Sequence, residues 1–322
     1  MNITEQMALA KRNTVEIVTE SELKDILSKK KHPVCYCGYE TSGAVHLGHA
    51  VTITKLMDLE KAGFKVKVLF ADWHTWLNRK GDWDFIHKTT KIWERSFKSM
   101  GLKNAEFVLG STFQRKMSYV DDLLSMSLDT TINRALRSMQ GIARDIEHAH
   151  VSQVIYPFMQ IEDIKALKVD VAVGGIEQRK IHMLGRELTP VLNYGPFACI
   201  HTPLIPSLQG PSGKMSSSKP ETMISVADSD EEIKKKIKKS YCPEGIVQDN
   251  PVLSIAKLLV FPRIDVLEIK RPEKFGGTVQ FENYDSLESA FVDKKLHPLD
   301  LKNKIADEVS DIFEPVRRHF KK

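Results

Sequence analysis

The segment from residue 34 to residue 71 constrains the fold more than any other part of the chain. Residues 34–39 (VCYCGY) predict a buried strand, and the alternation in residues 64–71 predicts a second one. Between them a helix is predicted to begin after His46 and to end near Gly63, with one apolar face made of Ala50, Ile53 and Met57. Strand, loop, helix and strand form a βαβ unit, which is right-handed by a strong general rule.

The same alternation continues for about 130 residues beyond this unit. Further strands are predicted at residues 105–109, 170–173 and 198–201, and helices at residues 151–167 and 178–188. Such alternation is typical of an α/β fold with a mostly parallel sheet that helices cover on both faces. The polar, helical stretch of residues 117–150 is interpreted as an insertion between sheet elements.

The character of the chain changes after about residue 218. Ser229 and Glu232 form a capping-box pattern that opens a Lys-rich helix. Two short strands, at residues 264–269 and 278–282, and a final amphipathic helix follow. We therefore expect a boundary between residues 225 and 245, and we divide the chain into a larger α/β domain and a smaller, mostly helical domain, residues 1–228 and 229–322.

Composition excludes several classes of protein. Lys plus Arg number 47 and Asp plus Glu number 42, a net charge of +5, and 42% of the residues are hydrophobic, which excludes a disordered or collagen-like chain. The small positive charge permits a nucleic-acid partner. The four cysteines have neither disulfide-framework nor zinc-site spacing, so we expect a cytoplasmic protein with reduced thiols and no bound metal. No apolar run is long enough to predict a membrane span.

The run GAVHLGH at residues 43–49 lies between the first strand of the βαβ unit and its helix. Ligands of open α/β sheets bind at the carboxyl ends of strands, where a helix N-terminus offers N–H groups to an anion. His46 and His49 are three residues apart and can face the same anion, while Gly48 allows a ring to approach the backbone. Two ordinary histidines at a helix start remain the alternative. A zinc site is weaker, because further ligands would be needed.

A second polar motif, GKMSSSK, occupies residues 213–219. Lys214 and the serines that follow suit a polyphosphate. The motif is not a P-loop, because Leu208 stands where the first glycine belongs and Met215 replaces the Ser or Thr. A solvated surface loop is the alternative for this motif taken alone.

Together, the two motifs resemble the HIGH and KMSKS signatures of class I aminoacyl-tRNA synthetases. The blocks GYETSGAVHLGH, VIYPFMQIED, VDVAVGGIEQRKIHML, KRPEKFGG and LHPLDLK further resemble the archaeal-type tyrosyl-tRNA synthetases, in the same order and over nearly the whole chain. The resemblance implies a Rossmann-type catalytic domain with a helical insertion and a C-terminal anticodon-binding domain. It also implies a homodimer.

The resemblance implies tyrosine–tRNA ligase activity, in which tyrosine and ATP, with Mg²⁺, give tyrosyl-adenylate and pyrophosphate before the tyrosyl group passes to tRNA(Tyr). The implied catalytic residues are His46, His49 and Lys214. The implied ATP-binding residues are these three together with Gly48, Met215, Ser216 and Ser217.

The implied tyrosine-binding residues are Tyr36, Tyr156, Gln160, Asp163 and Gln178. Three of them lie at positions i, i+4 and i+7 of one predicted helix and therefore share a face. A solvated helix side is the alternative for that face, and a core position is the alternative for Tyr36. The implied tRNA-binding residues are Arg137 and Arg179 at the acceptor end, and Phe275, His297 and Asp300 at the anticodon.

The sequence also departs from the family pattern at several positions. Thr41 stands where proline is usual, Thr112 replaces an acidic residue, and Ser217 replaces the second lysine of the general KMSKS pattern. ADWHTW replaces the more usual ADLHAY, which introduces Trp73, Thr75 and Trp76. These departures leave the reaction class intact and bear on fine side-chain specificity. Two other functions stay open at this point on separate grounds: a tryptophan–tRNA ligase and a non-catalytic RNA-binding paralogue.

Overall fold

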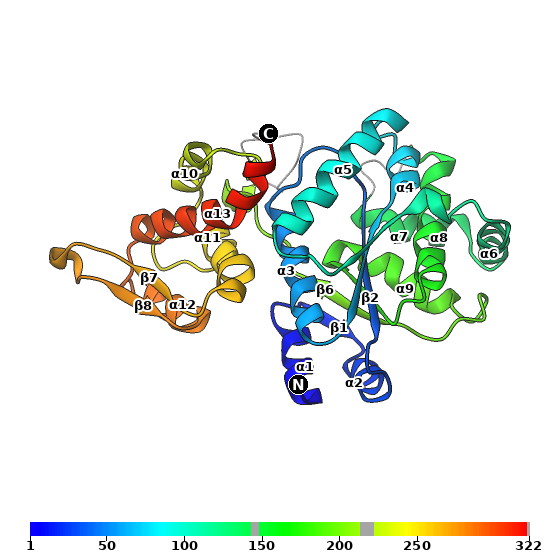
Figure 1. Cartoon of the computed structure of the whole chain (residues 1–322), viewed down its shortest axis with the longest axis horizontal. Coiled ribbons are helices and arrows are strands. Elements are labelled where there is room, and N and C mark those ends of the chain that lie inside the picture. The colour runs from blue at the N-terminus through cyan, green and yellow to red at the C-terminus, as the bar shows by residue number, and fades with distance from the viewer. Residues whose placement is uncertain (143–147, 213–221, 321–322) are drawn as a thin grey trace. The chain divides into compact units, whose positions relative to one another are not determined.

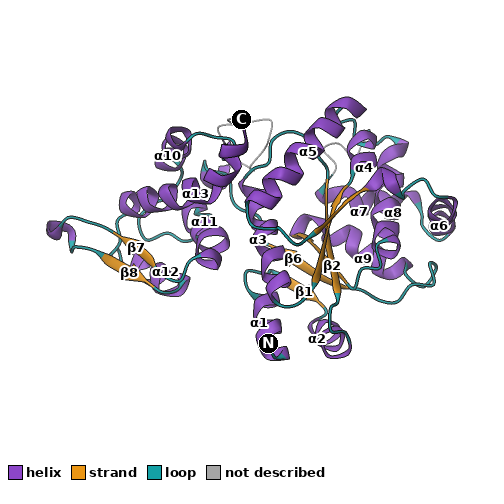
Figure 2. Cartoon of the chain, viewed as in Figure 1, coloured by secondary structure: helices purple, strands orange, loops and turns teal. Residues whose placement is uncertain are grey.

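The computed structural model describes residues 1–142, 148–212 and 222–320, and Figure 1 shows their helices and strands. Within them, six strands form one sheet in the order β1-β6-β5-β2-β3-β4. Figure 2 shows the strands in orange. Their bounds are Glu16–Val18 (β1), Val34–Tyr39 (β2), Lys65–Phe70 (β3), Glu106–Leu109 (β4), Val171–Gly175 (β5) and Ala198–Thr202 (β6). Strands β2 to β6 pair in parallel, as predicted, whereas β1 pairs antiparallel with β6.

Strand β1 is the one sheet element that the sequence analysis did not predict. It has only three residues, Glu-Ile-Val, which are too few to show an alternating pattern. The other five strands lie within two residues of their predicted bounds at each end.

The helices of this part of the chain are α1 to α9. Their bounds are Ile3–Lys11, Glu20–Lys29, Leu47–Lys61, Asp72–Leu77, Trp83–Ser99, Met117–Leu128, Ile132–Ser138, Val151–Ala166 and Arg179–Leu188. Thr19 and Glu22 form a capping box at the start of α2. Gly63 has a φ of +94° just beyond α3, a left-handed conformation that glycine adopts without steric cost.

Strand β2 lies inside the sheet, with β3 on one side and β5 on the other. Tyr36 pairs with Lys67 of β3 and with Ala172 of β5, and only 1% of its surface is exposed. It packs in an apolar cluster with Ile164 and Phe197. The central strand thus places one aromatic hydroxyl deep in the domain.

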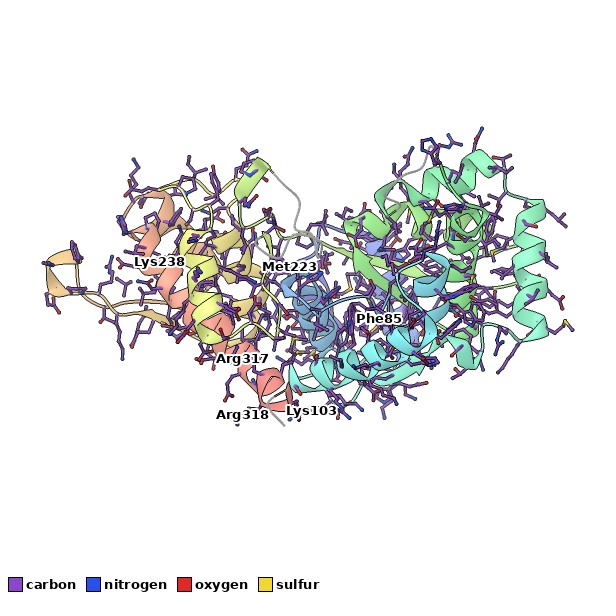
Figure 3. All side chains as sticks on the ribbon, turned by 90° about the horizontal axis from the view of Figure 1, so that it is seen from above. Phe85, Lys103, Met223, Lys238, Arg317 and Arg318 are labelled. Atoms are coloured by element: carbon purple, nitrogen blue, oxygen red, sulfur yellow. The ribbon has the colours of Figure 1, made fainter. Side chains whose placement is uncertain are left out.

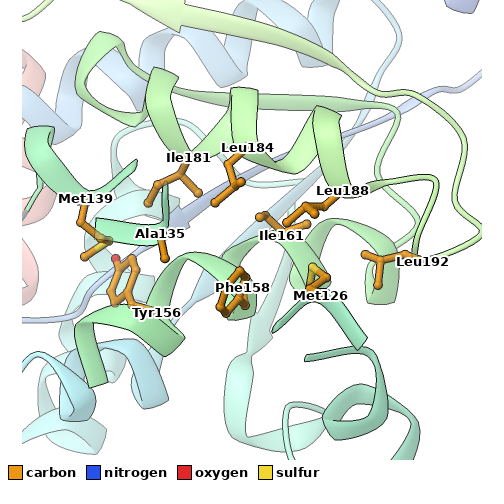
Figure 4. Packing of buried hydrophobic residues seen from close by; sticks show 10 residues of the cluster. All are labelled: Met126, Ala135, Met139, Tyr156, Phe158, Ile161, Ile181, Leu184, Leu188 and Leu192. Atoms are coloured by element: carbon orange, nitrogen blue, oxygen red, sulfur yellow. The ribbon is translucent and has the colours of Figure 1, made fainter. Parts of the chain in front are cut away.

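The predicted insertion packs closely onto the helices that follow it. Met126 of α6 and Ala135 of α7 share one buried cluster with residues of α8 and α9, shown in Figure 4: Tyr156, Phe158, Ile161, Ile181, Leu184 and Leu188. The other face of the insertion is apolar and exposed, at Met117, Leu124, Leu128 and Ile132. The insertion therefore has one face for the domain core and one that is open to a partner.

The chain forms two compact units. The first contains Met1–Ser42, Lys55–Glu94 and Leu102–Pro203, and the second contains Gly43–Thr54, Arg95–Gly101 and Leu204–Lys322. The GAVHLGH run therefore belongs to the second unit. The functional division into residues 1–228 and 229–322 stays a prediction.

The C-terminal elements are mostly helical: α10 (Asp230–Lys239), α11 (Pro251–Ile255), α12 (Tyr284–Val292), α13 (Pro298–Phe320) and the hairpin of β7 (Leu267–Ile269) with β8 (Val279–Phe281). Ser229 and Glu232 cap α10 as predicted. Helix α10, which carries Lys238, packs on α13, which carries Arg317 (Figure 3). Ser310 and Arg317 both donate to the Asp230 carboxylate and so fasten the two helices together.

No helix within residues 1–142, 148–212 and 222–320 is both long enough and apolar enough to cross a lipid bilayer.

Lys55 gives a test of how α1 is held on α3. Its buried ammonium donates to the carbonyls of Leu9 (3.2 Å), Ala10 (2.9 Å) and Arg12, at the end of α1. Lys55→Met leaves these carbonyls without this donor, so we expect the free energy of unfolding in urea to fall by about 2–3 kcal/mol. Lys61→Met, at an exposed position of the same helix, is the matched control. Equal losses in the two variants would contradict this account.

Candidate active site

Five predicted ligand-binding residues come together in the first unit. Tyr36 lies on β2, and Gln178 directly precedes α9. The other three residues lie on α8: Tyr156, Gln160 and Asp163. Gln160 Nε2 donates to Gln178 Oε1 at 3.2 Å, and the Gln160 side chain lies close to the Tyr36 hydroxyl. The i, i+4, i+7 spacing on α8 thus builds a polar wall opposite Tyr36.

Asp163 is the most constrained charge of this wall, because it is 1% exposed. Its Oδ1 lies 2.8 Å from Gln114 Nε2 and 2.8 Å from the Tyr119 hydroxyl. Burial raises the pKa of Asp163 to about 7, although both of these hydrogen bonds lower it. All the hydrogen bonds to this carboxylate that are described here use Oδ1, which leaves Oδ2 for another donor.

His74 lies beside Asp163 on the other side. Its Nε2 is 3.8 Å from Asp163 Oδ2, which is too far for a hydrogen bond, and it has no hydrogen-bond partner among the described residues. Burial lowers the pKa of His74 to about 3, so the ring is neutral at pH 7. Its ring meets that of Tyr156 edge to face at 4.5 Å. A ligand with a hydroxylated ring could therefore find a carboxylate oxygen, Asp163 Oδ2, and aromatic neighbours at this wall.

Burial also raises the pKa values of Tyr36 and Tyr156 well above the usual range, so both phenols stay protonated and can donate. The Tyr156 hydroxyl interacts with Glu40, which also accepts from Asn78 and Lys80. Two carboxylates, Glu40 and Glu177, thus lie among these residues and suit a ligand that carries an ammonium group.

Glu177 was missed by the sequence analysis, although it directly precedes Gln178. Its Oε2 is buried without a hydrogen-bond partner among the described residues, and burial raises its pKa. A Cβ on Gly175 would meet the Glu177 carboxylate, so glycine at this position lets the carboxylate take its present place.

The HLGH run is organised by its own backbone. The backbone N–H of His46 donates to His49 Nδ1, and that of Gly48 donates to His46 Nδ1, both at 3.1 Å. Because each Nδ1 accepts, each neutral ring carries its proton on Nε2 and can donate from there. Burial lowers the pKa of His46 to about 4, which keeps that ring neutral. A Cβ on Gly48 would lie 3.0 Å from the His46 ring, so glycine lets this arrangement form.

Lys214, Met215, Ser216 and Ser217 lie outside the described residues. The segment that follows them is fixed to the HLGH run, because Leu47 N–H donates to the Ile224 carbonyl at 2.9 Å and Val226 N–H donates to the Val45 carbonyl at 3.0 Å. The chain that leaves the second motif therefore pairs with the chain that enters the first.

The residues predicted to contact tRNA lie in both units. Arg137 on α7 and Arg179 on α9 are exposed on helices that pack together, and Arg179 pairs with Glu16. In the second unit Phe275 is 60% exposed in a short turn, with Lys274 Nζ 5.0 Å from its ring centre.

The turn that carries Phe275 is fixed to the start of α13. Arg271 donates to the carbonyls of Gly277 (3.0 Å) and Lys295 (2.9 Å), so the two segments are held together. His297 directly precedes α13 and Asp300 lies in its first turn, so both follow Lys295 by only a few residues. Sequence reasoning missed Arg271, whose only signal is its place in the KRPEKFGG block.

A family model described as tRNA synthetases class I (W and Y) matches residues 28–314. The chain belongs to this family. It is 47% identical to the tyrosine–tRNA ligase of Methanosarcina mazei, over 98% of this chain and 99% of that protein. The crystal structure of the Archaeoglobus fulgidus tyrosyl-tRNA synthetase complexed with L-tyrosine superposes with a TM-score of 0.96 at 47% identity, covering 98% of this chain and 99% of that one.

The tryptophan branch of the family is more distant. The tryptophanyl-tRNA synthetase of Aeropyrum pernix K1 matches with a TM-score of 0.74 at 17% identity, over 93% of this chain and 81% of that one, which shows a shared fold alone. The predicted resemblance to the archaeal-type tyrosyl enzymes and the predicted α/β class are thus confirmed.

The departures from the family pattern are compensated locally. Thr41 N–H donates to the Thr75 hydroxyl at 3.1 Å, a bond that the usual proline could not make because it has no N–H. Two departures therefore support each other. Thr112 is exposed and its hydroxyl donates to the Leu109 carbonyl, so it does not contact Asp163. The Trp73 ring packs edge to face on both Trp76 and Trp83. Trp76 and Trp83 stack on each other.

Proposed function

We propose that this chain is a tyrosine–tRNA ligase. The observation that carries the proposal is the buried Asp163 carboxylate, which keeps Oδ2 for a donor beside the Tyr36 hydroxyl. A phenol can donate to Asp163 and accept from Tyr36. Phenylalanine would leave both groups unpaired, and sites of this type reject such an analogue strongly; tyrosyl-tRNA synthetase, with discrimination of about 10⁵, is the general example.

In the first step the tyrosine carboxylate attacks the α-phosphorus of ATP, and pyrophosphate leaves. Tyr156, Gln160 and Gln178 hold the amino group of the substrate. The Nε2–H groups of His46 and His49 donate to phosphate oxygens as negative charge develops, and Gly48 lies against the nucleotide. Lys214 binds the departing pyrophosphate, and Met215, Ser216 and Ser217, which follow it, contribute to binding ATP. Such catalysis relies on positioning and charge stabilisation.

Mg²⁺ would accompany ATP as part of the substrate, as is usual for this ion, which binds through substrate phosphates more than through dedicated protein sites. Its role is to neutralise charge on the phosphates. Within the described residues there is no group of three His, Cys, Asp or Glu side chains that could hold a metal.

In the second step a ribose hydroxyl of the terminal adenosine of tRNA(Tyr) attacks the tyrosyl-adenylate. Arg137 and Arg179 contact the acceptor end. Phe275 stacks on an anticodon base, and His297 and Asp300 read its hydrogen-bonding edge, since a carboxylate accepts from a guanine. The enzyme acts in the cytoplasm as a homodimer, with the exposed apolar face of α6 and α7 as its interface.

Pyrophosphate exchange tests the activity. We expect ATP–pyrophosphate exchange with tyrosine and far less with phenylalanine or tryptophan. Asp163→Asn should lower kcat/KM for tyrosine by about ten- to a hundred-fold, because a charged hydrogen bond is lost, while the exposed Asp25→Asn should not. Exchange driven by tryptophan, or by none of the three amino acids, would contradict the proposal.

The pKa of Asp163 predicts a pH dependence. A protonated carboxyl accepts a weaker hydrogen bond than a carboxylate, so kcat/KM for tyrosine should rise as the pH increases through about 7. This acid limb should be absent in Asp163→Asn. An identical limb in the wild type and in that variant would assign it to another group.

The interface can be tested by charge insertion. Leu124 is 62% and Leu128 is 87% exposed on α6. We expect the wild type to sediment as a dimer and Leu124→Glu/Leu128→Glu to sediment as a monomer, because burying two carboxylates is costly. Leu299→Glu, at an exposed leucine of α13, should leave the mass unchanged. A monomeric wild type would contradict this proposal.

A further inference from the structure

We propose that Gln114 and Tyr119 are positioning residues that set the amino-acid specificity of the pocket, by holding Asp163 as a charged acceptor for a phenol. The inference rests on the proposed tyrosine–tRNA ligase function. Neither residue belongs to a motif that the sequence analysis singled out, and both reach Asp163 from outside α8.

The geometry divides the two oxygens of Asp163 between protein and ligand. Oδ1 lies within 2.8 Å of both Gln114 Nε2 and the Tyr119 hydroxyl, and an oxygen has two lone pairs, so these two donors saturate it. His74 Nε2, at 3.8 Å from Oδ2, makes no hydrogen bond with it. A ligand hydroxyl is therefore directed to Oδ2.

The two donors also oppose the cost of burying the charge. Asp163 is 1% exposed, and burial favours its neutral form, whereas hydrogen bonds from neutral donors favour the carboxylate. A carboxylate is the stronger acceptor for tyrosine, and it is also the more costly group to leave unpaired beside phenylalanine. Both effects increase the discrimination between tyrosine and phenylalanine. Because both require an ionised Asp163, both depend on the two donors that stabilise its carboxylate.

Tyr119 can respond to the charge of Asp163. Its hydroxyl has one proton and lies 2.8 Å from two acceptors, Asp163 Oδ1 and the Met159 carbonyl. The proton goes to the charged acceptor while Asp163 is ionised. When Asp163 is protonated, the hydroxyl can turn to Met159 and accept from the acid. Tyr119 therefore stabilises the carboxylate directly.

Gln114 is held in place by the turn that precedes it. It is 3% exposed, and its backbone N–H donates to the Gly110 carbonyl at 2.9 Å. A Cβ on Gly110 would collide with the end of the Gln114 side chain and would lie 2.9 Å from Asp72 Oδ1. Glycine at position 110 is thus required for the Gln114 amide to reach Asp163.

The experiment compares Tyr119→Phe and Gln114→Met, which each remove one donor at similar size, with Tyr194→Phe as the matched control. The Tyr194 hydroxyl donates to the Val169 carbonyl at 2.8 Å and is not part of the pocket. For each protein, kcat and KM are measured in pyrophosphate exchange with tyrosine and with phenylalanine across a pH series. Binding of L-tyrosine alone is measured by calorimetry over the same series, and folding by thermal melting.

We expect Tyr119→Phe and Gln114→Met to lower the tyrosine-to-phenylalanine ratio of kcat/KM by about ten-fold, mainly through KM for tyrosine. The acid limb of tyrosine binding should move to higher pH by about one unit. Gly110→Ala, which changes no donor, should shift the limb in the same direction by displacing Gln114.

Unchanged ratios and limbs in both donor variants, or equal changes in Tyr194→Phe, would overturn the inference, because a general loss of packing would move all three alike. If one variant fails to fold, the other two with the control still decide. A wild type that binds tyrosine without exchange would refute the proposed function, whereas the pH dependence of calorimetric binding would still test Gln114 and Tyr119.

Discussion

The position of β2 inside the parallel sheet is the constraint on which the rest of the catalytic machinery depends. Because β3 and β5 pair with it on both sides, most of its residues, Tyr36 among them, are buried, and its carboxyl end leads into the loop that precedes α3. Tyr36 can therefore lie within the domain, and the HLGH run can follow the same strand at the start of a helix. One strand thus carries Tyr36 and leads to the HLGH run, which are the residues proposed for the amino acid and for the nucleotide.

The pocket around Asp163 contains several buried polar groups. Asp163, His74 and Glu177 are withdrawn from water, and the protein compensates each one only in part. Asp163 has two donors on one oxygen, whereas His74 Nε2 and Glu177 Oε2 have no hydrogen-bond partner among the described residues. Such incomplete compensation costs stability and is retained where a ligand supplies the missing bonds.

The departures from the family pattern show how a pocket tolerates change around a preserved centre. Thr41 and Thr75 each replace the usual residue of the family, and the Thr41 N–H donates to the Thr75 hydroxyl. The usual proline at position 41 has no N–H, and the usual alanine at position 75 has no hydroxyl, so the bond needs both replacements. The Thr112 hydroxyl donates to the Leu109 carbonyl within the same turn, while the Gln114 amide, two residues later, donates to Asp163. These departures are thus accommodated by local hydrogen bonds, while Asp163 keeps its contact with Gln114.

The sequence by itself determined the elements with local signals: the βαβ unit, the cap of α10, and the polar face of α8, where residues at i, i+4 and i+7 share one side by helical geometry. Resemblance to a family added the roles of those residues. The tertiary structure alone decided the rest. Gln114 and Tyr119 lie 49 and 44 residues from Asp163, and a lone glutamine after a turn and a tyrosine in a helical insertion show no periodic signal. Strand β1 is too short to alternate and exists because β6 offers it an edge. Local patterns record which face is buried, whereas contacts between distant segments depend on how those faces pack.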